Sequence, residues 1–411
     1  MLSKSIKVLQ ANLNRSAPAT ESALQLAIEL KVDLLIVQEP WLIPNNQDLD
    51  YTNTRSISHQ GFTQILPHYN TILRPRTLVY ISRSFFAQVN LSSISPQDPD
   101  LLILDIKDKN LGFQLFNIYN EKDQSNNTSS RTLERVLYPQ TLSTNSLVLG
   151  DFNTHHPWWD PLAPTSSGAQ QFVEWIDQQN LSLLNSPGDP TFFRPNLERG
   201  SVIDLTLATE NLANKIQDWQ ILPDLGSDHF GILFTIQGTT QDLVNTPIEL
   251  GRFNTKLADW ELFTSTLQNH GFDFDFPETV NSQVSFNLLQ KNNELSNILD
   301  KSAEEFTKAI TKAAEASIPQ TTPGARAKAW WNPALKDLRK DMMWKQRNIS
   351  NSQIETKLLY LQAKNLYFQE IKKAKRDHWN QFLEKEDPQT IFKAMSYTKD
   401  YHKFNQLEIP S

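Results

Sequence analysis

The sequence predicts an α/β fold followed by a mostly helical region, and three observations support this prediction. In the first 238 residues, short runs rich in Val, Ile, Leu and Phe alternate with helical stretches and are bounded by Gly, Pro, Asn or Asp. The runs are almost continuously apolar, which is typical of buried sheets covered by helices. After about Gly238 the pattern becomes mostly helical. We therefore expect a domain over residues 1–238, a linker over 239–257 and a helical region over 258–411.

The first domain contains the expected strands, each a short β-type run that ends at a turn-forming or polar residue. In chain order the expected strands are Ile6–Gln10, Asp33–Gln38, Thr77–Ser82, Leu101–Ile106, Gly112–Tyr119, Ser146–Gly150, Ser201–Leu207 and Phe230–Ile236. Helices are expected at three places between them. These helices are Thr20–Lys31, Ser129–Thr141 and Ser167–Gln179.

The region after the linker is expected to form long helices. They span Ala258–Asn269, Ser282–Ala316, Pro333–Arg347 and Ser352–Lys385. Asn332 followed by Pro333 is typical of an N-cap and first turn, and Ser352 and Glu355 have the spacing of a capping box. The last helix has an apolar stripe that needs a partner surface. The stripe consists of Ile354, Leu358, Leu361, Phe368 and Ile371.

Composition excludes several classes of protein. The 411 residues include no cysteine, which excludes disulfides, cysteine-ligated zinc and thiol nucleophiles. The net charge is −7, which excludes a uniformly basic nucleic-acid coat but not a local basic face. No apolar run is long enough to span a membrane, and the start, MLSKSIKVLQ, has no secretory core. We therefore expect no membrane partner.

Charge is distributed unevenly along the chain. Residues 1–250 hold 16 Lys and Arg against 26 Asp and Glu, whereas residues 326–385 hold 14 against 6. Four tryptophans, Trp330, Trp331, Trp344 and Trp379, lie among the basic residues of that second segment. Such a mixture can bind nucleic acid through phosphate contacts and stacking. The alternative is a helical hairpin whose tryptophans face its own core or a further domain.

Polar residues gather where the expected strands end. Strand ends on one side of a sheet converge in space, and that edge is the usual place of chemistry in layered α/β folds. The residues at such ends are Asn12, Glu39, Tyr119, Asn120, Asp151 and Asn153, and further on Asp204, Ser227, Asp228 and His229.

Each of these residues also has a structural interpretation. Asn12 can be a turn or cap residue, and Asp151 with Asn153 can form an Asx-turn. Glu39 follows an apolar run, so its charge requires either a metal ion or a buried ion pair. In the pair Asp228-His229, the Asp can orient an imidazole that donates to a phosphate or accepts a proton. Single residues leave these alternatives open.

Taken together, the residues resemble the endonuclease/exonuclease/phosphatase superfamily, and most closely the AP-endonuclease-like domain of non-LTR retrotransposon polyproteins. The resemblance covers roughly residues 5–237, and GDFNTHHPWW is its most specific string. The matching strings are QANLNRS, LLIVQEPW, FNIYN, GDFNTHHPWWD, PTFFR, SVIDLTLAT and GSDHFGI. The later strings LADWELF and KAWWNPAL resemble the linker before the reverse transcriptase in such proteins. The resemblance implies a four-layered α/β sandwich, two sheets flanked by helices.

The resemblance also implies a metal-dependent reaction on DNA. Glu39, with Asn12 beside it, would hold Mg²⁺, or Mn²⁺ in its place. Asp151 would align or deprotonate the attacking water, and Asn153 would orient the scissile phosphate. The reaction would be in-line hydrolysis of one phosphodiester of double-stranded DNA, leaving a nick with a free 3′-hydroxyl.

Further roles follow from the same resemblance. His229 would stabilise charge on a phosphate oxygen, and Asp228 would fix its tautomer. Tyr119 would support the transition state or leaving group, and Asp204 would orient the site from the second sheet. One departure is that Pro40 stands where repair members often have lysine, which weakens any expectation of abasic-site specificity.

A hairpin formed by Thr191–Phe193 and the seventh expected strand, Ser201–Leu207, is a candidate DNA contact through its loop, Arg194–Gly200. By resemblance this hairpin probes the DNA groove, and its loop carries Arg194 and Arg199, which can contact phosphates. A solvated hairpin tip is the alternative. His156 and Trp159 are expected to pack against and brace the Asp151 loop rather than touch DNA.

Two other functions remain open at this point. One is a phosphoinositide or sphingomyelin phosphodiesterase of the same superfamily, and the other is an inactive nucleic-acid-binding remnant. The basic segment 326–385 could bind the element's RNA. Action on chromosomal DNA would imply a nuclear location, although the sequence contains no clear nuclear signal.

Overall fold

The computed structural model describes residues 5–42, 54–67, 74–108, 111–121, 132–194, 197, 199–238, 252–253, 255–269, 305–321, 328–349 and 354–384. The chain forms two compact units. The first consists of Met1–Thr246 with Ala325–Ser411, and the second of Pro247–Gly324. The first unit contains all of the candidate site residues.

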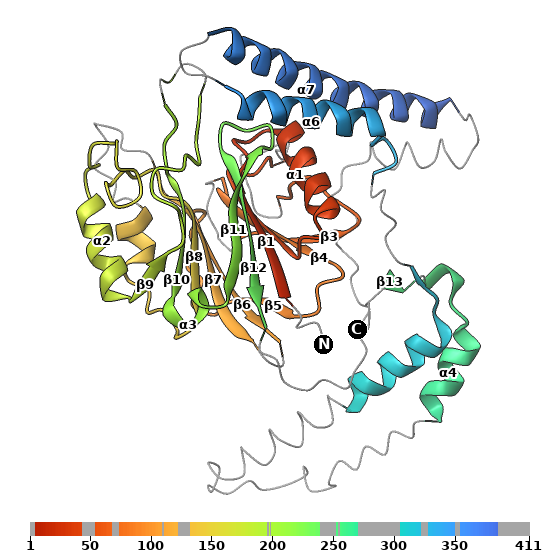
Figure 1. Ribbon diagram of the computed structural model, residues 1–411. Coiled ribbons are helices and arrows are strands. Elements are labelled where there is room, and N and C mark those ends of the chain that lie inside the picture. Colours follow the sequence, from red (N-terminus) through yellow and green to blue (C-terminus); the bar gives the residue numbers. More distant parts are fainter. Residues whose placement is uncertain are drawn as a thin grey trace, which may run out of the picture. The chain divides into compact units, whose positions relative to one another are not determined.

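Two six-stranded sheets form the centre of the first unit (Figure 1). The first sheet has the order β11 (Ile216–Asp224), β12 (Phe230–Gln237), β1 (Ser5–Asn12), β2 (Leu34–Gln38), β4 (Thr77–Ser82) and β3 (Phe62–Ile65). The second has the order β5 (Gln88–Leu91), β6 (Leu101–Lys107), β7 (Gly112–Tyr119), β8 (Ser146–Asp151), β10 (Asp204–Thr209) and β9 (Leu181–Leu183). In each sheet one central pair is parallel, β1 with β2 and β7 with β8.

Apolar side chains alternate between the two faces of each sheet, which creates three layers of core. The layer between the sheets includes Val8 and Ile36 from the first sheet and Leu104 and Leu149 from the second. Because successive strand residues point to opposite faces, their neighbours pack outward against helices. The result is the four-layered sandwich that the sequence predicts.

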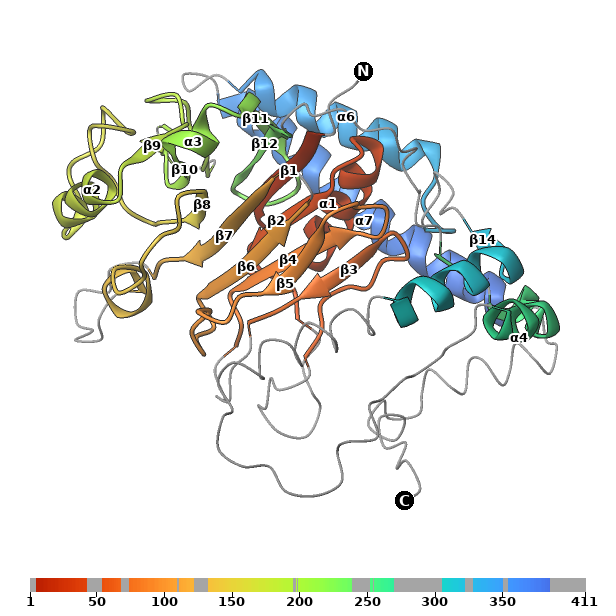
Figure 2. The ribbon, with the colours of Figure 1, turned by 90° about the horizontal axis from the view of Figure 1, so that it is seen from below.

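Helices cover the outer faces of the two sheets. Helix α1 (Ala17–Glu29) packs on the first sheet, and Ser16 caps it by accepting a hydrogen bond from the Ala19 amide. Helix α2 (Ala169–Gln178) and the short π-helix η1 (Leu133–Leu137) pack on the second sheet. The short α3 (Glu210–Ala213) follows β10. Figure 2 shows α1 and α2 on opposite sides of the sheets.

Some elements differ from the sequence-based prediction. The helix expected over Ser129–Thr141 is a single π-helical stretch at Leu133–Leu137 within the described residues. The strand expected from Ser201 begins at Asp204, because Ser201 instead forms an isolated bridge with Phe192. Strands β3, β5, β9 and β11 were not predicted. They lie at sheet edges or next to one, where a short or partly exposed strand has little apolar pattern.

Two long helices from the end of the chain pack on the first sheet's side of this unit (Figures 1 and 2). They are α6 (Pro333–Arg347), capped by Asn332, and α7 (Ile354–Leu383). The two helices share a small apolar core around Met342 and Tyr367. Arg339 of α6 binds Glu29 of α1, and the Tyr367 hydroxyl of α7 donates to Ser22 Oγ at 2.9 Å. The helical region therefore divides between the two units.

The second unit has its own small elements. A two-stranded pair joins β13 (Arg252–Phe253) to β14 (Gln320–Thr321). The 3-10 turn η2 (Thr255–Leu257) precedes α4 (Trp260–Gln268), and residues 305–317 are helical. Most of the helix expected over Ser282–Ala316 lies outside the described residues. No helix of the described part of the chain is long and apolar enough to cross a membrane.

Candidate active site

The candidate site lies where four central strands of the two sheets meet. Asn12 ends β1, Asp151 ends β8, Asp204 begins β10, and His229 immediately precedes β12. Asp204 and Asp151 face each other across the antiparallel pair formed by β10 and β8. Strand β10 runs antiparallel to β8, and β12 runs antiparallel to β1. The ends of β1 and β8 and the starts of β10 and β12 therefore lie at the same edge.

Polar side chains join the two sheets at this edge. The Gln10 side chain donates to the Gly150 carbonyl at 3.1 Å, and the Asn12 amide donates to Asp151 Oδ2 at 2.9 Å. Gly150 is needed where β8 passes β7, because a Cβ there would lie 1.9 Å from the Ile118 carbonyl oxygen. The two sheets are thus fixed relative to each other at the position of the site.

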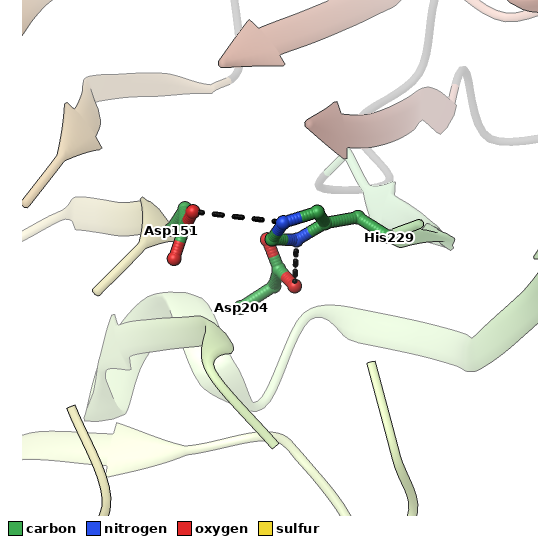
Figure 3. Close-up of side chains that lie close together, drawn as sticks. All are labelled: Asp151, Asp204 and His229. Carbon is green, nitrogen blue, oxygen red and sulfur yellow. Dashed lines mark hydrogen bonds and ion pairs between the residues drawn. The ribbon is translucent and has the colours of Figure 1, made fainter. Parts of the chain in front are cut away.

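Asp151, Asp204 and His229 form a buried group at the centre of the site (Figure 3). His229 Nδ1 lies 2.9 and 3.1 Å from the two carboxylate oxygens of Asp204, which is hydrogen-bond distance. On the other side, His229 Nε2 lies 3.9 Å from Asp151 Oδ2. The Phe192 ring packs edge-on against the imidazole. The imidazole is therefore held in one orientation between two carboxylates.

The charges in this group shift each other's protonation. Burial lowers the pKa of His229, but the Asp204 carboxylate, together with Asp151 and Asp228, outweighs burial and raises the pKa of His229 to about 9. Burial raises the pKa of Asp151; the His229 charge opposes this shift and the Asp204 charge adds to it, giving about 7. Near neutral pH, His229 is therefore a cation beside a carboxylate with enhanced basicity.

The loop after Asp151 is fixed by its own polar contacts. The backbone N–H of Asn153 donates to Asp151 Oδ1 at 3.0 Å, forming the Asx-turn that the sequence allows. Asn153 has a φ of 45°, and its side chain donates to the Asn120 carbonyl at 2.8 Å. Asn153 therefore lies beside Asp151, as the strand-end pattern predicts.

Asp228 is not the partner of His229, which corrects the sequence-based expectation. Asp228 Oδ1 accepts from the Asn14 side chain at 3.1 Å, and Oδ2 accepts from Arg194 Nε at 2.7 Å. The acid that contacts the imidazole of His229 is instead Asp204. Although burial opposes ionisation, the charges of His229 and Arg194 hold the pKa of Asp228 below its usual value.

Glu39 forms an ion pair at the rim of the site. Its Oε1 lies 2.9 Å from Arg15 Nη2, and the Arg15 amide donates to the Glu39 carbonyl. The Glu39 side chain is 14% exposed and that of Arg15 is 47% exposed. Of the two alternatives that the sequence allowed for Glu39, the ion pair is present. Metal binding by Glu39 stays a prediction.

Tyr119 lies at the end of β7, under a guanidinium group. The Arg76 guanidinium stands 4.9 Å from the centre of the Tyr119 ring, and Arg76 itself is bound by Asp100 and Glu121. Burial, followed by the charges of Glu39 and Asp151, raises the pKa of Tyr119 well above its usual value. Tyr119 therefore stays a neutral hydroxyl donor beside the acidic site.

The two candidate DNA-binding arginines differ in their surroundings. Arg194 binds Asp228 and packs over the Phe192 ring, and 48% of its side chain is exposed. Arg199 Nη1 instead donates to Asp160 Oδ1 at 3.0 Å, and His155 Nδ1 lies 3.1 Å from the other oxygen of that buried carboxylate. Arg199 thus braces the segment that follows Asp151.

His156 and Trp159 have the packing role that the sequence favoured. Trp159 is fully buried, its indole nitrogen donates to the Thr154 carbonyl at 3.0 Å, and the His156 ring packs beside it. Asn14, Arg15 and Arg76 were missed as site neighbours. The turn-like string around Asn14 was the available signal for the first two, whose φ values are positive; nothing in the sequence distinguishes Arg76.

By distance alone, three residues of the site could together bind a metal ion. Ligand atoms of Asp151, Asp204 and His229 lie within 4.8 Å of one another. Both ring nitrogens of His229 face carboxylates and are protonated in the cation, so they are not free to bind a metal. The carboxylate oxygens of the site, with Glu39 at its rim, are the ligands that suit a hard cation such as Mg²⁺. The residues therefore fit an oxygen-ligated divalent ion.

Part of the chain matches a known family. Residues 113–233 match the family model described as endonuclease-reverse transcriptase. Among curated proteins, no match to the chain was found.

Similar folds occur among solved structures. The chain is similar to the endonuclease domain of TRAS1, a telomere-specific non-LTR retrotransposon, with 21% identity and a TM-score of 0.46 over 58% of this chain and 100% of that one. It is similar to the AP endonuclease LMAP from Leishmania major, with 16% identity and a TM-score of 0.42 over 57% of this chain and 89% of that one. It is also similar to the 3′-5′ exonuclease NExo from Neisseria meningitidis, with 17% identity and a TM-score of 0.40 over 56% of this chain and 100% of that one.

The matched family segment runs from β7 into β12 and contains the three central residues Asp151, Asp204 and His229. The two-sheet arrangement agrees with the fold that the sequence resemblance implied. Residues 113–233 of the two-sheet domain are therefore similar to an endonuclease-reverse transcriptase family.

Proposed function

We propose that this domain is a Mg²⁺-dependent DNA endonuclease that nicks target DNA and leaves a 3′-hydroxyl, as target-primed retrotransposition requires. The observation that carries the proposal is the buried imidazole of His229, held by Asp204 and placed 3.9 Å from Asp151. A fixed cation beside a basic carboxylate is what phosphodiester hydrolysis needs. The description of the matched family as endonuclease-reverse transcriptase supports the retrotransposon setting.

The side chains divide the work of hydrolysis between them. Asp151, with its raised pKa, accepts the proton of the attacking water. His229, held as a cation by Asp204, stabilises the negative charge that grows on a non-bridging phosphate oxygen. Tyr119 stays protonated and supplies a hydroxyl donor to the transition state or the leaving oxygen. Asn153 orients the scissile phosphate from the loop after Asp151.

Glu39 and Asn12 would hold the metal ion. When bound, Mg²⁺ supplies positive charge next to phosphate oxygens. Exchange of the partly exposed Arg15 for a divalent cation leaves the charge of Glu39 compensated. Asn12 already donates to Asp151, so it links the proposed metal ligand to the proposed base.

Nicking of supercoiled plasmid by the full chain tests the proposal. We expect relaxed circles in Mg²⁺ buffer and none after EDTA, with activity restored when Mg²⁺ is added back. Extension of the nick by a DNA polymerase without prior end repair reports the 3′-hydroxyl. Release of phosphate or phosphocholine from lipid headgroups, measured in parallel, would instead favour the lipid phosphodiesterase. An intact plasmid and intact lipid would favour an inactive binding module.

The partners outside the site follow from the same proposal. Double-stranded DNA is the substrate, and action on chromosomal DNA would place the protein in the nucleus. The element's RNA is a candidate ligand of residues 326–385. In that segment Trp344 is 64% exposed and Trp379 40% exposed, whereas Lys328, Arg339 and Lys375 bind acids of α1. RNA contact would therefore use the outer face of these helices.

A further inference from the structure

Helix α7 contacts the turn that carries Asp228 and His229. Lys364 Nζ donates to the Ser227 carbonyl at 2.8 Å. One turn further along α7, the Phe368 ring packs against the backbone of Gly226. Both contacts are made more than 130 residues away in sequence from the turn, within the same compact unit. The end of the chain therefore reaches a candidate active-site segment.

The turn is shaped to receive this helix. Gly226 has a φ of 103°, and a Cβ at that position would lie 2.3 Å from the Phe368 ring. Leu225, next to it, is buried in the outer core of the first sheet, where Phe368 also packs. A glycine at this point is required both by the backbone conformation and by the close approach of Phe368.

The contacts lie directly next to the site. Ser227 is 3% exposed, and its hydroxyl accepts from the His229 amide at 3.3 Å while also contacting Asp228 at 3.3 Å. A shift of Ser227 would therefore move the backbone of His229, just before β12, and with it the imidazole ring. The hydrogen bond between His229 Nδ1 and Asp204 depends on where that ring lies.

A second contact of α7 reaches the hairpin loop. Lys357 Nζ donates to the Leu197 carbonyl at 3.3 Å, two helical turns before Lys364. Arg194 and Arg199 belong to the same loop. Spacing of seven residues places Lys357 and Lys364 on one face of the helix, and Phe368 follows one turn later. One helix face thus touches both segments.

We propose that Lys364 and Phe368 are positioning residues of the nuclease, so that α7 clamps the turn 225–229 and is itself part of the nuclease. This inference rests on the proposed function. Neither residue touches the reacting groups; both act through Ser227 and Gly226. Loss of the clamp lets His229 move away from its alignment with Asp151 and Asp204, and small displacements of catalytic groups reduce turnover strongly.

The test uses Lys364→Ala and Phe368→Ala in the full chain. We expect kcat for plasmid nicking to fall about 10- to 100-fold, with a smaller change in KM for DNA, because the clamp acts first on the placement of His229. Lys364→Arg, which keeps a donor for the Ser227 carbonyl, and Phe368→Leu, which keeps most of the apolar volume, should each restore most of the loss.

Tyr367→Phe is the matched control for docking of the helix. It removes the hydrogen bond to Ser22 but leaves the contacts with Ser227 and Gly226, so its kcat should equal that of the wild type. A fall in kcat as large as that of Lys364→Ala would show that any weakening of docking lowers activity, and it would contradict a specific clamp.

Amide hydrogen exchange gives a readout that does not need activity. Peptides covering residues 225–230 should exchange faster in Lys364→Ala and Phe368→Ala than in the wild type or Tyr367→Phe. Equal exchange in all four proteins would overturn the clamp. A wild-type chain that fails to nick would contradict the proposed function, whereas the exchange comparison would still decide whether α7 holds the turn.

Discussion

The centre and the rim of the candidate site are built differently. At the centre, Asp151, Asp204 and His229 are 5% exposed or less and hold one another by short contacts. At the rim, the carboxylates of Glu39 and Asp228 are each paired with an arginine whose side chain is about half exposed. The charges at the centre are fixed by burial, whereas those at the rim have partners that water reaches.

This difference separates two tasks. Buried groups with one possible geometry stabilise a transition state, because they need no reorganisation during the reaction. Half-exposed ion pairs contribute little stability, so their arginines can leave for a phosphate at small cost. We therefore expect changes at the centre to reduce turnover and changes at the rim to alter metal and DNA binding.

The largest expected effect comes from His229→Ala. Removing the imidazole takes away the fixed protein cation that stabilises charge on the phosphate, and turnover in plasmid nicking should fall by about 10²- to 10⁴-fold. The fold should survive, since the change removes a side chain at the sheet edge. Circular dichroism checks the fold. If the turnover of His229→Ala lies within a factor of three of wild type, His229 has no catalytic role.

The next largest effect distinguishes Asp204 from Asp228. Asp204→Asn removes the charge that raises the pKa of His229, so kcat should fall about 100-fold or more, and the alkaline limb of its pH profile should move to lower pH. Asp228→Asn should lower kcat less, and the alkaline limb of its pH profile should stay close to the pH at which wild type has it. The pH profiles of nicking by the two proteins make the comparison. A larger loss of kcat in Asp228→Asn than in Asp204→Asn would instead make Asp228 the acid that orients His229.

At the rim, Glu39→Gln should change the metal requirement. Losing one carboxylate ligand should raise the Mg²⁺ concentration needed for half-maximal nicking by about 10- to 100-fold, in the range of a lost ligand contact. Arg15→Gln is the matched control, since it keeps Glu39 and should lower that concentration or leave it unchanged. A Mg²⁺ titration that is the same for Glu39→Gln and wild type would exclude Glu39 as a ligand.

The two arginines of the hairpin should respond in different ways. Arg194→Gln should weaken DNA binding and reduce the slope of log K against log salt by about 1, as expected for one lost phosphate contact. Arg199→Gln should instead lower stability by about 1 kcal/mol, since it removes a partner of the buried Asp160. Binding isotherms at several salt concentrations and thermal unfolding measure the two effects. Equal behaviour of both variants would contradict the assignment.

The last expected effect is on the pH dependence of stability and not on nicking or DNA binding. The pKa of His229 is about 9 in the folded state against about 6.5 for an unperturbed imidazole, so its charge stabilises the fold below pH 6.5. That contribution is lost as pH rises through 9. The raised pKa of Asp151 acts in the same direction. Chemical unfolding between pH 6.5 and 9 should show a shallower decline for His229→Gln than for wild type, and parallel declines would contradict this assignment.

The sequence predicted the layers and the position of the site well, because both depend on local patterns. Apolar runs ending in Asn12, Asp151 or Tyr119 indicated strands whose ends converge, and the structure places these residues at one edge. The roles of the site residues in catalysis, metal binding and DNA contact stay predictions. Edge strands such as β5 escaped prediction because their exposed residues carry little periodicity.

Pairings between distant residues could not be predicted. Asp228 is adjacent to His229 in sequence, yet the orientation of the chain before β12 turns Asp228 toward Arg194 and leaves His229 to Asp204. Of the apolar stripe predicted on α7, Ile354 and Leu358 are 72% and 51% exposed, and the sequence did not indicate which surface Phe368 and Ile371 would cover. That surface includes α1 and the turn at Gly226, which only the folded chain brings together.

The most direct test of the account compares wild type and Asp151→Asn in single-turnover nicking of supercoiled plasmid. Asn keeps the volume of the buried carboxyl but cannot accept the proton of water. Wild type should convert the plasmid to relaxed circles in Mg²⁺ buffer, while folded Asp151→Asn leaves it supercoiled over the same time. Nicking by Asp151→Asn at the wild-type rate would contradict catalysis at this buried centre.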